Sequence, residues 1–222
     1  MFGAKYHGFA GVRGYQLTRS LRFRASASAY LNRTNVASPT SASKFTTSFW
    51  FKRGTITGTG TEQWWFDGPD VGSGGDFGLF FNSAQDGTWG IEWGSTGGAA
   101  NYLVANSKLR DPSSWYHFVV AVDSSQATNT NRILAWVNNV AVTWSSATYP
   151  GTSQTYSWNQ GSQACRIGAI YPSTGGRYFD GYMSEFNHVD GQYLTPSSFG
   201  QTDAVTGVWV PKKYSGTYGT NG

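Results

Sequence analysis

Glutamate, methionine and cysteine are scarce in this sequence. Its 222 residues include only three glutamates (Glu62, Glu92 and Glu185), two methionines and one cysteine, and 13% of the residues are charged. Helices favour Ala, Leu, Glu and Lys, and no stretch repeats apolar residues at helical spacing, so we expect no long helix. The single cysteine, Cys165, excludes an internal disulfide, and we interpret it as a buried thiol.

Long hydrophobic runs are also missing. No run approaches the roughly 18 residues of a membrane-spanning helix, and residues 1–20 lack the continuous apolar stretch of a signal peptide. The sequence therefore predicts no membrane insertion. It also predicts a protein that is made, and kept until assembly, in a cytoplasm.

Acidic residues are absent before Glu62. The same stretch carries nine basic residues, whereas the whole chain has a net charge of only +4. This asymmetry indicates an acidic partner. Because there is no recognition helix, RNA-binding strand signature or zinc-ligand spacing, we favour an acidic protein surface over nucleic acid.

Aromatic residues and glycine are abundant instead. Aromatics make up 17% of the chain, and there are 29 glycines. Many short strands joined by tight turns have this composition, so the fold class predicted is all-β, an antiparallel jelly-roll β-sandwich. Alternating apolar residues predict strands at 20–30, 45–52, 63–66, 77–81, 88–93, 102–104, 115–123, 133–137, 140–144, 166–169 and 178–186.

The stretch from Cys165 to Gly191 reads as a hairpin, with two alternating segments on either side of a Pro- and Gly-containing turn. The pattern predicts one core, which should contain Phe49, Val119, Ile133, Val137, Ile167 and Phe179. We also expect Trp50, Trp115 and Trp136 to be buried in it.

The domain organisation follows from where the alternation begins. Residues 1–18 show neither strand nor helix periodicity and are predicted to be an extended N-terminal arm, too poor in patterned apolar residues to pack on its own sandwich. Residues 19–222 are predicted to form one sandwich domain, with a C-terminal extension from about residue 190. In the N-terminal region, basic and aromatic side chains are the candidates for attachment to a partner: Lys5, Phe9, Arg13, Tyr15 and Arg19.

Three segments resemble those of laminin-G-like (concanavalin A-like lectin/glucanase) domains and occur in the same order. They are FTTSFWFKR at 45–53, WYHFVVAVD at 115–123, and RIGA with YFDGYMSEF at 166–186. The resemblance covers residues 21 to about 186. The tail, with DGQYLTPSSFG and PKKYSGTYGTNG, resembles a narrower group, the laminin-G-like proteins that tailed bacteriophages carry on the virion.

This resemblance implies a function in adhesion. We expect a virion protein, a tail fibre or capsid decoration, attached through its N-terminal region to a phage capsid or tail protein and presenting the sandwich to a host-surface glycan. An inert capsid cement protein and a carbohydrate-binding module of a bacterial protein are the alternatives. Assembly into a homo-oligomer stays open.

Catalysis is not expected. Glycan-cleaving enzymes of this fold need two carboxylates across the scissile bond, usually two nearby glutamates on one strand, and the three glutamates here are isolated in sequence. The three histidines are too scattered to indicate a Ser/His/Asp triad. We therefore expect a protein that is not an enzyme and requires no cofactor.

Two kinds of binding residue are candidates. The resemblance allows calcium, and its candidate ligands are the carboxylates among the glycines at Asp67, Asp70, Asp76 and Asp86. Their spacing fits no defined calcium loop, so we favour the interpretation that they are solvated turn aspartates. Three aromatic rings in the Ser/Thr/Gly-rich loop at 145–163 are candidates for stacking on sugars. They belong to Tyr149, Tyr156 and Trp158.

Overall fold

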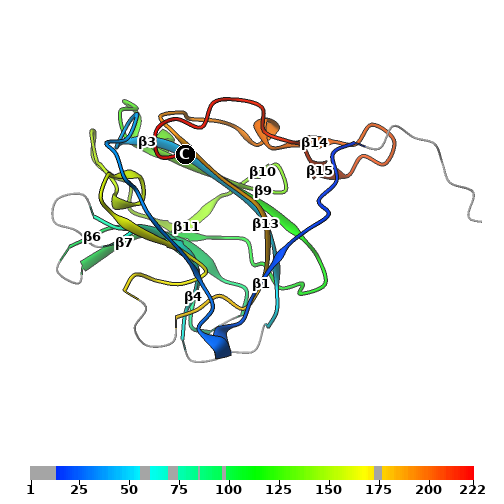
Figure 1. Cartoon of the computed structure of the whole chain (residues 1–222). Coiled ribbons are helices and arrows are strands. Elements are labelled where there is room, and N and C mark those ends of the chain that lie inside the picture. The colour runs from blue at the N-terminus through cyan, green and yellow to red at the C-terminus, as the bar shows by residue number, and fades with distance from the viewer. Residues whose placement is uncertain (1–13, 56–60, 70–74, 85, 97–98, 173–176) are drawn as a thin grey trace, which may run out of the picture.

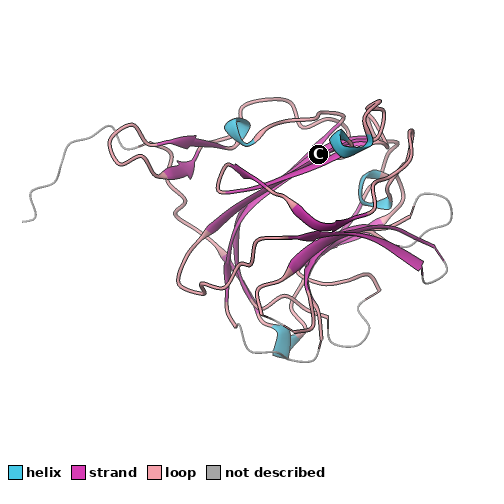
Figure 2. Ribbon diagram, turned by 180° about the vertical axis from the view of Figure 1, so that it is seen from behind, coloured by secondary structure: helices cyan, strands magenta, loops and turns pink. Residues whose placement is uncertain are grey.

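The computed structural model describes residues 14–55, 61–69, 75–84, 86–96, 99–172 and 177–222. Within them, two antiparallel sheets pack face to face, and the only helices are short 3-10 turns (Figures 1 and 2). No helix among the described residues is long and apolar enough to cross a membrane. The predicted all-β sandwich is confirmed.

The first sheet has six strands in the order β1-β13-β3-β8-β9-β10. Their bounds are β1 Leu21–Phe23, β13 Gly181–Asp190, β3 Lys44–Arg53, β8 Tyr116–Asp123, β9 Ile133–Val137 and β10 Val140–Ala141.

The second sheet has seven strands in the order β11-β7-β6-β5-β4-β12-β2. Their bounds are β11 Trp144–Ala147, β7 Ala99–Ala105, β6 Trp89–Thr96, β5 Phe77–Phe81, β4 Gln63–Asp67, β12 Ala164–Ile167 and β2 Leu31–Thr34.

The core lies between the inward faces of these sheets and is dominated by aromatic rings. Successive side chains of a strand point to opposite faces, so each strand contributes every second residue to the core. Phe49 of β3 lies near its centre, with ring centroids 5.2 Å from Phe186, 5.5 Å from Phe118 and 5.8 Å from Trp65. Of the predicted core residues, Phe49, Ile133, Val137, Ile167 and Phe179 lie in or against this cluster.

Val119 lies elsewhere, on the outward face of the six-stranded sheet. It packs with Val189 and Phe199 in a second cluster that also contacts Trp136. The prediction of one core containing Val119 is therefore wrong. Trp50 also faces outward, although it is covered, and Trp115 is 38% exposed.

The second cluster exists because the C-terminal extension folds back over that outward face. After β13 come the 3-10 helix η5 (Pro196–Ser198) and a small hairpin of β14 (Gly200–Thr202) and β15 (Trp209–Pro211), which lies beside the six-stranded sheet in Figure 1. Phe199 is 2% exposed beneath it.

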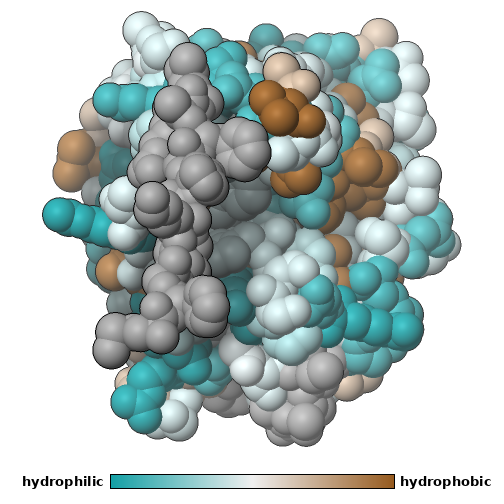
Figure 3. All heavy atoms as spheres, turned by 90° about the vertical axis from the view of Figure 1, so that its right-hand side faces the viewer, coloured by the Kyte–Doolittle hydropathy of each residue, from teal (hydrophilic) through white to brown (hydrophobic). Residues whose placement is uncertain are grey.

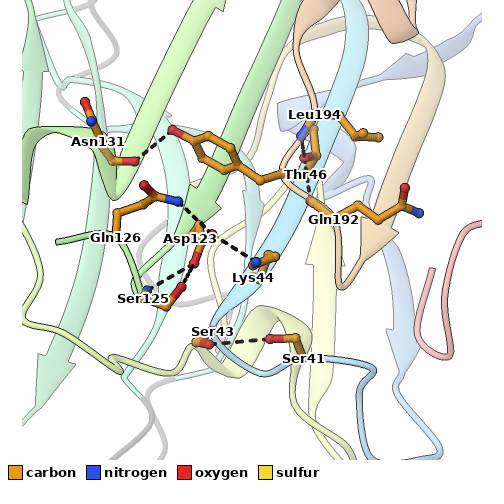
Figure 4. Close-up of polar contacts among 11 residues, drawn as sticks. Ser41, Ser43, Lys44, Thr46, Asp123, Ser125, Gln126, Asn131, Gln192 and Leu194 are labelled. Atoms are coloured by element: carbon orange, nitrogen blue, oxygen red, sulfur yellow. Dashed lines mark hydrogen bonds and ion pairs between the residues drawn. The ribbon is translucent and has the colours of Figure 1, made fainter. Parts of the chain in front are cut away.

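Hydrogen bonds attach the start of this extension to β3 and to the loop after β8 (Figure 4). The Thr46 hydroxyl donates to the Gln192 carbonyl at 2.8 Å and accepts the Leu194 amide at 2.8 Å. The hydroxyl of Tyr193 donates to the carbonyl of Asn131 at 2.7 Å. These bonds hold residues 192–194 against both β3 and the loop after β8.

The predicted strand at 20–30 is wrong in its second half. The chain leaves β1 at Phe23, forms the 3-10 turn η1 (Ala25–Ala27), passes through Ser28 at φ 51° and enters β2 in the other sheet. Alanine and serine at 25–29 have little surface to bury, so their alternation did not determine a strand.

The segment from Cys165 to Gly191 is a hairpin only next to its turn, where Ala169 and Tyr178 form an antiparallel bridge and the Phe179 amide donates to the Gly168 carbonyl at 2.9 Å. Beyond that, β12 pairs with β2 and β4 in one sheet, whereas β13 pairs with β1 and β3 in the other. A local pattern does not show whether consecutive strands pair with each other or lie in opposite sheets.

The end of the predicted N-terminal arm lies on the sandwich. The Tyr15 hydroxyl donates to Glu185 at 2.5 Å, and the Ser184 hydroxyl donates to the carbonyl of Arg19 at 2.6 Å. These contacts hold the end of the arm at the surface of the sandwich without burying it, since Tyr15 is 37% exposed and residues 14, 16 and 18 are exposed as well. The attachment candidates Lys5, Phe9 and Arg13 lie outside the described residues.

Truncation of Phe49 should strongly destabilise the fold. We expect Phe49→Ala to lower the free energy of unfolding by about 3–5 kcal/mol, because it leaves a cavity among rings from both sheets. Chemical denaturation followed by fluorescence measures this loss. Val205→Ala, at a side chain that is 93% exposed, is the control and should change stability by less than about 0.5 kcal/mol. A loss below about 1 kcal/mol for Phe49→Ala would contradict the central position of this ring.

Candidate functional site

A row of polar residues crosses the outward face of the seven-stranded sheet. Cross-strand partners run without a break from β2 through β12, β4, β5 and β6 to β7, and they are Asn32, Arg166, Asp67, Gly78, Glu92 and Tyr102. Their neighbours Cys165, Ile91 and Leu103 point into the core. Because side chains alternate along each strand, these members of the row share the outer face. We call this set the polar row.

Gly78 in the middle of the row makes room for an aromatic ring. A Cβ atom at this position would lie 2.5 Å from Cζ3 of Trp64 and 2.6 Å from Oδ1 of Asp67, so no larger residue fits without displacing them. Trp64 stacks on Phe80 with centroids 5.1 Å apart, and Phe80 meets Tyr102 edge to face at 5.9 Å. Aromatic rings therefore run alongside the hydrogen-bonding groups.

Two neighbouring members of the row each hold a buried polar atom that has no hydrogen-bond partner among the described residues. These atoms are Oδ1 of Asp67 and Nε of Arg166. The two residues are directly paired across β4 and β12. One atom is an acceptor and the other a donor, and leaving such atoms unpaired costs roughly 1–3 kcal/mol each.

The remaining atoms of this pair are held in place. Oδ2 of Asp67 accepts the amide of Tyr171 at 2.8 Å, and Nη1 of Arg166 donates to the carbonyl of Ile170 at 3.2 Å. The Arg166 guanidinium also lies over the rings of Tyr30, at 4.6 Å, and Tyr171, at 4.8 Å. The unpaired atoms are thus preorganised and not free to turn away.

Burial disfavours the ionised form of two carboxyl groups on this face, Asp67 and Glu92. Burial, followed by a hydrogen bond with Asp76, raises the pKa of Glu92 to about 8. Burial also raises the pKa of Asp67 well above its usual range, and the Tyr171 amide opposes the shift only in part. The Tyr102 hydroxyl donates to Glu92, which accounts for a smaller opposing effect on the Glu92 pKa.

The described residues do not fit a calcium ion. Asp67 and Asp76 lie on the same face, but Asp86 is at another loop, where it pairs with Lys108 and accepts the Thr88 amide, and Lys108 lowers the Asp86 pKa. Among the residues the structure describes, no group of three or more His, Cys, Asp or Glu side chains could hold a metal. Asp70, the fourth candidate, lies outside them.

The predicted sugar-stacking rings point inward. Tyr156 and Trp158 are buried, and Tyr149 is half-buried against the same core. Trp158 packs on Phe66 at 4.4 Å and donates to the Thr47 hydroxyl at 3.2 Å. The exposure that sugar stacking requires is therefore absent at Tyr156 and Trp158, because the 145–163 loop closes one end of the sandwich.

The polar row was missed from the sequence because its members are far apart along the chain. The one local signal was Gly78, a glycine inside an otherwise aromatic strand, which often marks a close approach of another group. The register of five strand pairs was needed to assemble the row, and that of β12 with β4 to place Arg166 beside Asp67.

Comparison with known proteins supports the fold. The model of the concanavalin A-like lectin/glucanases superfamily matches residues 25–197. The chain belongs to this superfamily. No curated protein matches it.

Several solved structures are similar to this chain at low identity. A heptameric SAP-like pentraxin from Limulus polyphemus is 13% identical, with a TM-score of 0.49, over 75% of this chain and 71% of that one. The CBM40 of the Ruminococcus gnavus IT-sialidase is 12% identical, with a TM-score of 0.48, over 75% and 95%. Domain 4 of AbnA, an arabinanase from Geobacillus stearothermophilus, solved with arabinotriose, is 17% identical, with a TM-score of 0.46, over 71% and 65%.

The raised pKa of Glu92 makes stability depend on pH. The folded chain keeps a proton that the unfolded chain loses above its ordinary pKa of 4.5, so this stabilisation is full below about pH 4.5 and is lost as pH rises through 8. We expect the melting temperature to fall between pH 5 and about 8.5, and Glu92→Gln to flatten the profile. A difference of one bound proton between the folded and unfolded chain changes the free energy of unfolding by up to about 1.4 kcal/mol per pH unit.

Differential scanning fluorimetry across this range is the measurement. Glu185→Gln is the matched control on β13 and should leave the slope unchanged. Equal slopes for the wild type and Glu92→Gln would show that Glu92 ionises normally in the folded protein.

Proposed function

We propose that the chain is a non-enzymatic saccharide-binding domain and that the polar row is its binding site. The observation that carries this proposal is the line of polar side chains across one sheet face, in which the half-buried Arg166 and the 39% exposed Tyr102 flank the buried carboxyl groups of Asp67 and Glu92. A sugar hydroxyl both donates and accepts, so adjacent hydroxyls could accept from the arginine and donate to the tyrosine oxygen.

Rings beside Arg166 fit the same kind of ligand. Tyr30 stacks on Tyr178 at 6.3 Å and carries the Arg166 guanidinium on its face, and Tyr30 is 39% exposed. The apolar face of a sugar packs on such rings while its hydroxyls reach polar groups. Tyr102, equally exposed at the far end of the row, offers a second ring. An extended oligosaccharide crossing the strands would meet both.

The carboxyl geometry argues against hydrolysis. Glu92 and Asp76 share a hydrogen bond, which places their carboxyl groups closer than the roughly 5 Å that a retaining glycosidase needs and well short of the wider inverting spacing. Asp67 and Glu92 are also buried. These side chains support a role in holding the site rather than in attacking a glycosidic bond.

Binding should depend on the guanidinium group of Arg166. A glycan array identifies the ligand, and titration calorimetry should then show at least a tenfold loss of affinity for Arg166→Lys, which keeps the charge but lacks that group. Arg110→Lys, at an exposed arginine that donates to the Asp86 carbonyl, is the control and should bind as the wild type does. Bound glycans should release no reducing ends on incubation.

Three outcomes would count against this proposal. An array without any bound glycan, or equal affinity of Arg166→Lys and the wild type, would reject the polar row as a saccharide site. Release of reducing ends that Glu92→Gln abolishes would instead identify a glycosidase.

The place of this domain is proposed to be the surface of a tailed-phage virion, as a tail fibre or capsid decoration in contact with a host-surface glycan. This part of the proposal rests on the resemblance of residues 190–222 to phage virion proteins and on the acid-free, basic N-terminal region. A capsid or tail protein would be the partner. The proposed binding function requires no cofactor.

Attachment to the particle should require residues 1–13. Residues 14–20 are held to β13, so a deletion of 1–13 leaves every described contact intact. We expect the shortened protein to fold, by circular dichroism, and to be lost from purified particles, because Lys5 and Arg13 no longer attract an acidic surface. A deletion protein that is incorporated normally would place attachment elsewhere on the domain.

A further inference from the structure

A second hollow lies on the opposite side of the sandwich, where the C-terminal hairpin covers the outward face of the six-stranded sheet. It has a volume of about 410 Å³, within the range of small-ligand sites, and is lined by Trp50, Trp115, Asn138, Asn139, Thr202, Gly207, Val208 and Trp209. A neighbouring hollow of about 340 Å³ shares Trp50 and Trp115 but is also lined by Arg19. We call the 410 Å³ hollow the tryptophan groove.

A stack of three rings forms the floor of the groove. Trp50 stacks on His117 with centroids 4.8 Å apart, and His117 stacks on Trp209 at 6.0 Å. The Trp209 indole donates to Nδ1 of His117 at 2.9 Å, so Nε2 carries the imidazole proton and donates to the Ser48 hydroxyl at 2.9 Å. Burial lowers the pKa of His117 to about 3, which keeps the ring neutral and the stack intact at ordinary pH.

The β9–β10 turn forms one wall. Asn138 and Asn139 both have positive φ, 49° and 67°, as a tight hairpin turn requires. The Asn138 side chain accepts the amide of His117 at 2.7 Å, which fixes the turn against the stack. Both asparagines are exposed, and Gly207 and Val208 of the C-terminal hairpin form the facing wall.

Hydrogen-bond donors on these walls are unused. No described residue accepts from the indole N–H of Trp50 or Trp115, or pairs with the Asn139 amide, and Trp115 is 38% exposed. The 410 Å³ hollow contains no charged side chain. Figure 3 views the molecule from the side on which this hairpin projects in Figure 1, and apolar residues gather there among hydrophilic ones.

We propose that the tryptophan groove is a second saccharide site, specific for a neutral sugar. An exposed tryptophan offers the flat apolar surface on which a sugar ring packs, and indole and amide N–H groups beside it suit hydroxyl acceptors. Without an ionised group in the groove, an acidic sugar gains nothing there and loses its hydration. An apolar peptide is the competing occupant, since its backbone carbonyls could accept from the same donors, and the test below separates the two.

This site is separate from the polar row. The two lie on outward faces of different sheets, and the groove contains no residue of the row. Loss of sugar binding in Arg166→Lys would therefore not affect binding in the groove. Loss of binding in the groove would likewise not affect binding at the polar row.

The test uses the full chain with maltohexaose, cellohexaose and laminarihexaose as probes, at millimolar concentration. We expect at least one probe to shift the indole N–H resonances of Trp50 and Trp115 in the NMR spectrum. For that probe, Trp115→Ala should weaken binding at this site at least tenfold and Asn139→Ala about threefold, as expected for a lost ring and a lost hydrogen bond. Arg166→Lys should leave these indole shifts as they are in the wild type.

Val140→Ala, at an exposed neighbour of the turn, is the matched control and should bind normally. Trp115→Phe keeps an aromatic face and should retain part of the affinity, which separates loss of the ring from loss of the fold. Absence of indole shifts with all three probes would overturn the proposal, as would unchanged binding by Trp115→Ala. Shifts caused by an apolar peptide but by no sugar would assign the groove to a protein partner.

Discussion

Packing of aromatic rings between the two sheets is the constraint on which the rest of this structure depends. Once Phe49, Trp65 and Phe118 occupy the inward face, the period of two along each strand determines what the outward face displays. A shift of β4 by one residue would turn Asp67 into the core and Phe66 out of it. The polar row therefore exists because the core fixes the register of six strands.

β13 departs from this alternation and thereby serves both faces. At Glu185, with φ 49°, a bulge in β13 shifts its pairing with β3 between Ser184 and Asn187. Met183 and Phe186 consequently both contact the main core, and Val189 packs under the C-terminal extension. Bulges add a residue and re-aim the side chains that follow, which accounts for this double use.

Much of the architecture could be predicted from the sequence, since strands such as Lys44–Arg53 and Tyr116–Asp123 are short segments dense in aromatic and β-branched residues. Pairing could not. The partners of β12 and β13 depend on how the chain crosses between sheets, and Ala25–Ala27 form a turn because small side chains give alternation little energetic weight. The burial of Tyr156 and Trp158 likewise depends on loop closure, which composition does not encode. For the same reason Arg166 and Asp67, about a hundred positions apart in sequence, become neighbours only once the register is known.

The imidazole of His117 links two parts of the chain that are remote in sequence. It accepts a hydrogen bond from Trp209 of the C-terminal extension while it stacks on Trp50 of the central sheet. The tryptophan groove is consequently complete only while the extension is docked, and a molecule held between Trp115 and Val208 binds the docked form alone. By mass action such a molecule would hold the extension closed, so occupancy of the groove and protection of residues 200–211 from proteolysis rise together.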